Sequence, residues 1–247
     1  MILKAFKYRL KPTNEQSILL DKHIGSARFV YNLALEVKQM AYAGNKINLS
    51  QFDLIKQLPD LKKECEWLKE INSQTLQQSI VNLDTAYTNF FKGNAEFPKY
   101  KSKKKGKKSF NVPQSVKVEN GVLKIPKFTK GIKVIQHREF EGKVKQATIS
   151  KTPTGKYFVS VLVETTSYYL PKQPITEANT IGIDLGIKDF LITSNGEKIA
   201  NPKYLKNAIS KLKFVQSKYS KKKGKRTKEK LAKLHEKVVN KRTDFLH

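Results

Sequence analysis

Cysteine, tryptophan and long apolar runs are scarce in this chain. Its 247 residues include one tryptophan and one cysteine, Cys65. A single cysteine excludes an internal disulfide and a zinc site built from several cysteines of this chain, and it is typical of a reducing compartment. The apolar runs are far shorter than the roughly 18 residues of a membrane span, and the N-terminus lacks the apolar core of a signal peptide. We therefore expect a cytoplasmic protein without zinc and without a membrane partner.

Acidic residues are scarce as well. The chain has 21 Asp and Glu against 49 Lys and Arg, a formal net charge of +28. Such an excess predicts a polyanionic partner, and nucleic acid is the first choice. Solvated charge that only keeps the protein soluble explains one basic run, but it explains several poorly. The candidate nucleic-acid-binding residues are Arg28, Lys99, Lys101, Lys103, Lys104, Lys105, Lys107, Lys108, Lys221, Lys222, Lys223, Lys225 and Arg226.

The N-terminal third is predicted to be one strand followed by helices. Residues 1–10 place apolar side chains largely on one alternating face, which is typical of a strand. Thr13 is the expected N-cap of the next helix, with Gln16 at the capping-box position three residues later. Further helices are expected over residues 50–58 and 73–91, and the apolar residues of the second fall on one face.

An interruption is predicted within the first helical region. Apolar residues recur at helical spacing over 18–40, but Gly25 and Ser26 break the pattern, which predicts two helices. The joining segment GSARFVYN fits a DNA-binding helix-turn-helix, and it equally fits an ordinary pair of antiparallel helices. In the first case Arg28 contacts nucleic acid. In the second it is a surface or salt-bridging arginine.

The middle of the chain is typical of a β domain. Seven of the ten residues in 99–108 are lysines, which predicts a solvated loop. Short alternating runs separated by glycine and proline fill 109–166, and strands at this spacing favour a small barrel or sandwich. The strand at 1–10 is a candidate member of the same sheet. The helices would then be an insertion within a β domain.

The C-terminal third is expected to form a second region. Residues 167–179 resemble a linker, and 180–185 and 189–193 are predicted strands. From 202 onward the pattern is helical, in two parts interrupted by the basic stretch 218–228. Residues 202–247 contain 16 Lys and Arg against 3 acids, so this helix pair is a further candidate for nucleic-acid contacts.

One carboxylate stands inside the apolar stretch IGIDLGIKDF. Burying an ionised Asp184 in such a segment costs several kcal/mol unless a partner compensates it. The partner is water if the residue lies at an exposed strand end. The stretch also resembles the first phosphate-binding turn of actin-like and Hsp70-like ATPases, although Ile187 and Lys188 stand where those proteins have small hydroxyl residues. A third interpretation is the first Mg²⁺ ligand of an RNase H-like nuclease.

Six segments, taken in order along the chain, form a recognisable set: FKYRLKPTNEQ, GSARFVYN, LPDLKKECEWLKEINSQTLQQSIVNLDTAYTNFF, FPKYKSKK, GIDLGIKDF and LAKLHEKVVNKRTDFLH. Together they resemble the TnpB (OrfB) proteins of insertion sequences, which are related to type V CRISPR nucleases. The resemblance extends over essentially the whole chain.

The resemblance implies an α+β fold of several domains and an RNA-guided DNA endonuclease. Such a protein binds a guide RNA and a double-stranded DNA target and cuts the DNA with Mg²⁺. The implied domains are a β-barrel (wedge) domain at 1–10 plus 109–166, an inserted helical recognition domain at 11–108, a linker at 167–179, and a partial RNase H-like (RuvC) α/β domain at 180–247.

Asp184 matches the first catalytic and metal-binding aspartate of the family, with Gly182 and Gly186 as its matching neighbours. The sequence departs from the family in the other site residues. The family also uses a glutamate, a second aspartate and a four-cysteine zinc element, and no acid after Asp184 stands in an equivalent context.

We therefore expect the N-terminal portion of such a nuclease. It is expected to bind guide RNA and DNA, to hold no Mg²⁺ firmly, and not to cleave alone unless a C-terminal RuvC fragment supplies the other carboxylates. One alternative is a DNA- or RNA-binding regulator that is derived from the nuclease and does not cut. Another is a fragment of an actin-like ATPase.

Overall fold

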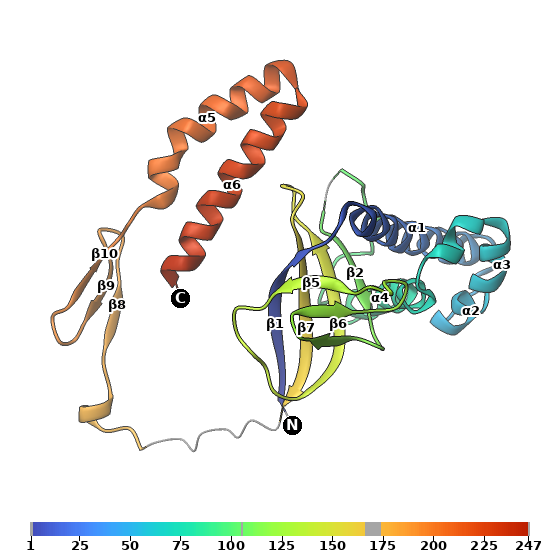
Figure 1. The fold of residues 1–247 in the computed structure, drawn as a ribbon, viewed down its shortest axis with the longest axis horizontal. Helices are drawn as coiled ribbons and strands as arrows, with labels where there is room; N and C mark the ends of the chain where they lie inside the picture. The colour runs from blue at the N-terminus through green and yellow to red at the C-terminus, as the bar shows by residue number, and fades with distance from the viewer. Residues whose placement is uncertain (1, 105, 166–173, 247) are drawn as a thin grey trace. The chain divides into compact units, whose positions relative to one another are not determined.

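The computed structural model describes residues 2–104, 106–165 and 174–246. The chain divides into two compact units, Met1–Ser167 and Tyr168–His247. The predicted linker 167–179 lies partly outside the described residues, and its described part contains a short 3₁₀ turn, η2, at Glu177–Asn179. The chain therefore combines helices and sheets in each unit, which agrees with a mixed α/β fold (Figure 1).

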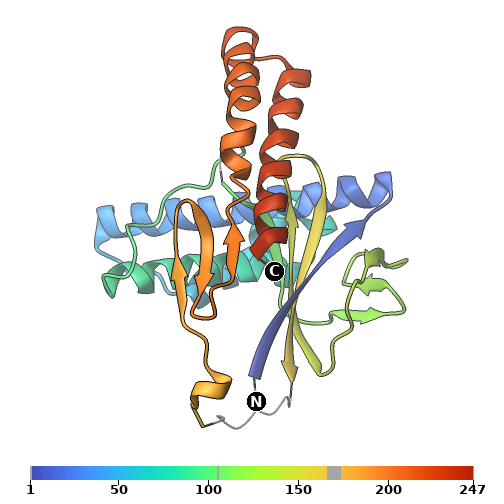
Figure 2. The same cartoon turned by 90° about the vertical axis from the view of Figure 1, so that its left-hand side faces the viewer.

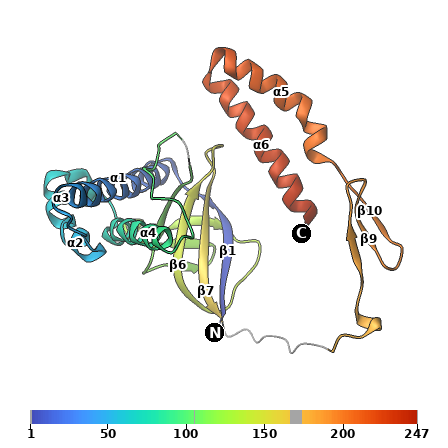
Figure 3. The same cartoon turned by 180° about the vertical axis from the view of Figure 1, so that it is seen from behind.

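A curled antiparallel sheet of seven strands forms the base of the first unit (Figures 1 and 3). The strand order is β2-β6-β7-β1-β5-β4-β3, so β1 occupies the middle of the sheet. It pairs with β7 from Ile2↔Thr165 to Leu10↔Tyr157, and its last residues also pair with β5. The strands are β1 Ile2–Lys11, β2 Lys108–Val112, β3 Lys117–Glu119, β4 Val122–Lys124, β5 Ile132–Ile135, β6 Lys143–Lys151 and β7 Tyr157–Thr165.

The helices between β1 and β2 leave the sheet and return to it. They are α1 Asn14–Asn45, α2 Gln51–Lys56, α3 Leu58–Glu64, the 3₁₀ helix η1 Glu66–Glu70, and α4 Ser73–Phe91. Because the first strand lies within the sheet and the next strand follows all of these helices, the helical segment is inserted into the β structure. The expectation that residues 1–10 share the sheet with the later strands is thus confirmed.

Helix α1 is continuous, and the prediction of two helices joined by a turn is wrong. Its N-terminus begins as expected, because Thr13 caps it and Gln16 completes the capping box. At the predicted break, the Ser26 hydroxyl donates to the Lys22 carbonyl within the helix. A helical glycine costs only about 1 kcal/mol relative to alanine, and burial of the surrounding residues outweighs this cost.

Two hydrophobic cores account for that burial. Leu20, Ile24 and Ala27 of α1 belong to the core over the sheet. Val30 and Leu35, further along the same helix, belong to a second core with α2, α3, η1 and α4. Helix α1 therefore connects both cores, and it can do so only because it continues through Gly25.

His23 is the polar centre of the junction between α1, α4 and the sheet. Its ring is almost fully buried between Phe110 and Phe128, at centroid distances of 5.1 and 5.4 Å. Nδ1 lies 2.8 Å from the Leu19 carbonyl oxygen, and Nε2 accepts a hydrogen bond from the Asn72 amide. Burial lowers the pKa of His23 from its ordinary value, because a charged imidazolium would lose hydration there.

The second unit contains a three-stranded antiparallel sheet and two helices (Figure 2). The strand order is β10-β9-β8, and α5 and α6 pack against each other with Leu212, Val215 and Val238 buried. The helical interruption expected over 218–228 is reduced to Lys223 and Gly224, with Lys223 in the left-handed region at φ 42°. The elements are β8 Ile183–Leu185, β9 Asp189–Thr193, β10 Lys198–Ala200, α5 Tyr204–Lys222 and α6 Lys225–Leu246.

Among the helices that the structure describes, none combines the length and the apolar character needed to cross a membrane.

Candidate nucleic-acid interface

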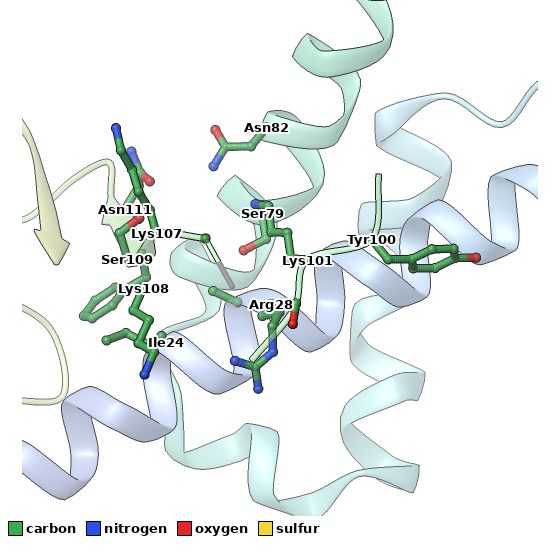
Figure 4. Close-up of a pocket in the computed structure, with 14 residues that line it drawn as sticks. Ile24, Arg28, Ser79, Asn82, Tyr100, Lys101, Lys107, Lys108, Ser109 and Asn111 are labelled. Carbon is green, nitrogen blue, oxygen red and sulfur yellow. The ribbon is translucent and has the colours of Figure 1, made fainter. Parts of the chain in front are cut away.

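A basic cleft of about 480 Å³ lies in the first unit between α1, α4, the loop after α4, and β2 (Figure 4). Four predicted residues line it: Arg28 from α1, Lys101 and Lys107 from the loop, and Lys108 at the start of β2. The sequence separates Arg28 from the lysines by more than 70 positions. The fold brings them together because α1 and β2 both pack at this side of the sheet.

Apolar and neutral polar side chains form the rest of the basic cleft. Ile24, Ala27 and Phe110 belong to the buried core beneath it. No Asp or Glu lines the basic cleft within the described part of the chain, so its four cationic side chains face no carboxylate there. Positive charge that lacks a counter-charge in a concave surface attracts and concentrates polyanions.

The position of Arg28 follows from the continuity of α1. The residues before it pack in the core over the sheet, and the residues after it pack in the helical core. Arg28 itself is half-buried, and the described residues provide no ion pair for it. The helix-turn-helix interpretation of Arg28 is wrong in this structure, since no turn separates two helices there. Arg28 reaches the basic cleft from the middle of one long helix.

The lysine-rich loop is fastened to α1 next to the basic cleft. The Asn32 side chain donates to the Lys101 carbonyl at 3.0 Å and accepts from the Lys101 amide at 2.8 Å. The Lys101 amino group lies 3.7 Å from the centre of the Tyr31 ring, and the Tyr100 hydroxyl donates to Gln39. Lys101 is solvent-exposed, but the groups around it desolvate its amine and lower its pKa.

Five neutral polar residues of the basic cleft were not predicted from the sequence, and one of them, Ser102, lies in the lysine-rich loop. Ser79 and Asn82 project from α4, and Ser109 and Asn111 follow the lysines in β2. Asn111 also donates to Thr148 on β6, at 3.2 Å, which holds it in place. Ser79 and Asn82 are three positions apart, so they lie on one face of the predicted helix. This spacing is the feature of the sequence that could have identified them as a pair. Neutral donors of this kind commonly contact phosphate and sugar oxygens.

The other predicted lysines of the loop do not line the basic cleft. Lys99, Lys103 and Lys104 are exposed nearby along the chain, and Lys99 forms an ion pair with Glu96. Lys105 lies outside the described residues. The remaining predicted residues belong to the second unit and are exposed where α5 ends and α6 begins; they are Lys221, Lys222, Lys223, Lys225 and Arg226.

Asp184 lies in the middle of β8, opposite Ile192 of β9. The strand is at the edge of its sheet, and all three of its residues are exposed, including Ile183 at 58% and Leu185 at 70%. Solvent therefore compensates the carboxylate charge in this unit. The apolar sequence around Asp184 does not bury it here.

The described residues do not fit a two-Mg²⁺ site. Such a site requires several carboxylates that converge on the ions. In residues 2–104, 106–165 and 174–246, no group of three or more His, Cys, Asp and Glu side chains is placed to hold a metal. Asp184 is thus a single exposed carboxylate, and no other potential ligands converge on it among the described residues.

Comparison with known proteins gives matches at both ends of the chain. Residues 1–46 match a family described as a helix-turn-helix domain of IS605 OrfB, and residues 158–247 match the IS605 OrfB family described as a probable transposase. In the structure, the described residues of the first match form strand β1 and helix α1.

Curated relatives match along the whole chain. A putative RNA-guided DNA endonuclease of Streptomyces pristinaespiralis is 36% identical over 256 residues, covering 100% of this chain and 63% of the relative. The putative RNA-guided DNA endonuclease InsQ of Escherichia coli K12 is 32% identical, covering 99% of this chain and 62% of the relative. The chain thus spans about three fifths of the length of these relatives.

Among solved structures, a cryo-EM CRISPR-Cas12f ternary complex is similar at 12% identity and a TM-score of 0.44. The match covers 94% of this chain and 59% of the Cas12f chain.

Proposed function

The chain belongs to the TnpB (OrfB) family of transposon-encoded proteins, and we propose that it binds a guide RNA and a double-stranded DNA target in the cytoplasm. The observation that carries the proposal is the basic cleft, where Arg28, Lys101, Lys107 and Lys108 meet without a lining carboxylate. Each phosphate that these groups neutralise releases condensed counterions, so binding should weaken steeply with salt.

Two basic surfaces share this role in the proposal. The basic cleft of the first unit combines cations with the neutral donors Ser79, Asn82, Ser109 and Asn111, which suits a sugar-phosphate backbone. The α5–α6 turn of the second unit presents a separate group of exposed cations. We assign both surfaces to backbone contacts, because lysine and arginine side chains at a backbone give affinity without reading sequence.

We further propose that this 247-residue polypeptide does not cleave DNA alone. In the family, Asp184 corresponds to the first of three RuvC carboxylates that hold Mg²⁺, and the described residues provide no converging partner carboxylates. A C-terminal RuvC fragment that carries the remaining ligands would complete the site. This part of the proposal depends on ligand number, whereas the binding proposal depends on charge.

The binding test measures the dissociation constant for RNA and for duplex DNA across salt concentrations. A linear log–log dependence is expected, with a slope of roughly −0.7 to −0.9 per phosphate contact. Replacing both Arg28 and Lys107 by Ala should weaken binding and flatten this slope. Lys130→Ala and Lys133→Ala remove the same charge outside the basic cleft and serve as the control. Affinity that does not change with salt would contradict the proposal.

The cleavage test uses plasmid DNA, guide RNA and Mg²⁺. The chain alone should leave the plasmid intact, and adding a polypeptide with the other RuvC carboxylates should restore cutting that Asp184→Ala abolishes. Cutting by the chain alone, lost in Asp184→Ala, would overturn the proposed inactivity. Tight binding to duplex DNA that needs no RNA would instead favour the non-cleaving regulator.

A further inference from the structure

A second cleft, of about 580 Å³, lies in the first unit between the C-terminal part of α1, the C-terminal part of α4 and the following loop. Five aromatic side chains line it: Tyr42, Tyr87, Phe90, Phe91 and Phe97. We call it the aromatic cleft. None of the residues assigned to the basic cleft lines it, so the proposed phosphate contacts do not explain it.

The rings of the aromatic cleft are ordered against each other and are partly open to solvent. Tyr87 and Phe91 are nearly parallel, with centroids 6.3 Å apart, and Phe97 meets both Tyr87 and Phe90 edge-on at 5.6 and 5.3 Å. Phe91 is 78% exposed. Tyr42, which contributes from α1, is 59% exposed. Large aromatic side chains gathered in an exposed concave patch mark a binding site more often than a folding requirement.

The charges of the aromatic cleft favour a neutral flat group over a phosphate. Lys38 and Asp84 both line it, so the lining carries one cationic and one acidic side chain. Lys38 is also engaged, since its amino group donates to the Leu49 carbonyl and lies 5.2 Å from the Tyr87 ring centre. Asn48 and Thr88 add neutral hydrogen-bonding groups to the lining. Aromatic faces with polar groups beside them suit a nucleobase, which has a π face and a polar edge.

The aromatic cleft is linked to the basic cleft by a short piece of chain. Phe97 lines the first, and Tyr100 and Lys101 line the second. Three residues of extended chain span at most about 11 Å. The Tyr100 hydroxyl donates to Gln39, which itself lines the aromatic cleft. One single strand can therefore have phosphates in the basic cleft and a base in the aromatic cleft.

We propose that the aromatic cleft binds an unpaired nucleobase of a single-stranded nucleic acid whose neighbouring phosphates occupy the basic cleft. The base stacks on the exposed rings of Phe91 and Tyr42. The amino group of Lys46 lies over the Tyr42 ring, 5.1 Å from the ring centre, and places a cation there. The inference rests on the proposed nucleic-acid-binding function and adds to it a site that holds a base.

The experiment compares two oligonucleotides of equal length and charge: a single-stranded RNA of twelve nucleotides and a twelve-unit abasic sugar-phosphate strand. The chain should bind the RNA about 10-fold more tightly, as expected when one base stacks on protein rings. Replacing Phe91 and Tyr42 together by Ala should remove this difference and leave abasic binding unchanged. Phe91→Trp should retain it.

Phe52→Ala is the matched control, because Phe52 is an aromatic residue of similar exposure, 64%, on α2 and outside the aromatic cleft. It should leave both affinities unchanged. As a direct readout of stacking, an RNA with 2-aminopurine should lose fluorescence on binding to the wild-type chain and lose less on binding to the Phe91 and Tyr42 double variant. Circular dichroism confirms that the variants are folded.

The outcomes separate this inference from the proposed function. Equal, salt-dependent affinities for the RNA and the abasic strand would overturn base binding by the aromatic cleft. The proposal of nucleic-acid binding would remain intact. A double variant that weakens both strands equally would also overturn base binding by the aromatic cleft. The inference would also be wrong if the chain formed a dimer that Phe91→Ala dissociates, while the bases had no effect on binding affinity. The aromatic cleft would then contact a second copy of the chain. Absence of binding to either strand at low salt would contradict both proposals.

Discussion

Nε2 of His23 accepts a hydrogen bond from the backbone amide of Asn72 at 3.3 Å, across 49 positions of sequence. The imidazole must be neutral at Nε2 to accept this bond, and its other nitrogen lies against the Leu19 carbonyl. Burial between Phe110 and Phe128 disfavours the charged form, and Lys127 adds repulsion, so the pKa of His23 is lowered. One neutral ring thus joins α1 to the start of α4.

The first prediction is a loss of stability in mild acid. Because the folded pKa of His23 lies below the unfolded value of about 6.5, the unfolded chain binds this proton more readily. The free energy of unfolding should be highest above pH 6.5 and decrease as the pH falls below it. Carboxyl groups with lowered pKa, such as Asp53 and Glu119, reduce stability only near and below pH 4.5, so the two windows are separate.

Thermal unfolding measured between pH 7.5 and pH 5 tests this prediction. The wild-type midpoint should fall over this range, and His23→Gln should flatten the fall, whatever its effect on the midpoint at pH 7.5. His235→Gln removes an exposed histidine of the second unit and should keep the wild-type slope. An unchanged slope in His23→Gln would show that another group causes the pH dependence.

The second prediction concerns Gly25 in α1. Beyond the neighbouring backbone of its own helix, a Cβ atom at this position would meet no atom within 4 Å, so Gly25→Ala should stabilise the helix by about 0.5–1 kcal/mol. The thermal midpoint should rise by about 1–4 °C. Gly131→Ala is the opposite case, since Gly131 has φ +63° and a Cβ would overlap Cγ1 of Val122. It should lower the midpoint. A stabilising effect at both positions would contradict the described backbone.

The third prediction concerns the fastening of the lysine-rich loop. Asn32→Ala removes both hydrogen bonds to the Lys101 backbone, at a cost of about 1 kcal/mol for the fastened loop. Trypsin should then make its first cut within residues 99–104 about fivefold faster than in the wild-type chain. Mass spectrometry locates this cut. Asn82→Ala is the matched amide control, because Asn82 lines the same cleft but bonds to Gln78 within α4. Equal cutting rates in both variants would refute the role of Asn32.

The fourth prediction concerns the carboxylate of β8. Because Asp184 is exposed on an edge strand, Asp184→Asn should leave hydrogen exchange of the β8–β9 hairpin and of α5 unchanged. Leu212→Ala, in contrast, removes a side chain buried in the second unit and should accelerate exchange in α5 and α6. Faster exchange around β8 in Asp184→Asn would show that the carboxylate has a structural partner.

Much of the local structure could be predicted from the sequence. Helix α4 has the expected bounds, Ser73–Phe91, and strand β9 is Asp189–Thr193 as predicted. The capping box of Thr13 and Gln16 is present. These features depend on neighbouring residues, whose periodicity and hydrogen-bonding groups are visible in a single sequence. Gly25 misled the prediction because its intrinsic helix cost is smaller than the burial gained on both sides of it.

The arrangement of the candidate site could be predicted only in part. Charge indicated the lysine-rich runs as nucleic-acid-binding, whereas Arg28 was indicated through a helix-turn-helix interpretation that the structure does not support. The sequence did not show which of them share a cleft, because that depends on contacts across long separations, such as Asn32 with Lys101. The aromatic residues of α4 looked like one packed face, yet Phe91 is largely exposed. The exposure of a side chain depends on what the rest of the fold leaves uncovered, and helical periodicity alone does not reveal this.

The central place of β1 has a consequence for biosynthesis. Its partner β5 begins at Ile132, and its partner β7 runs from Tyr157 to Thr165. During synthesis, β1 thus lacks its neighbour β5 until Ile135 has been translated, and it lacks its neighbour β7 until Thr165 has been translated. The helices between can assemble earlier, since their contacts are more local. The first ten residues therefore enter the fold among the last, and a folding intermediate that consists of helices with an unpaired N-terminal strand is the species most exposed to aggregation.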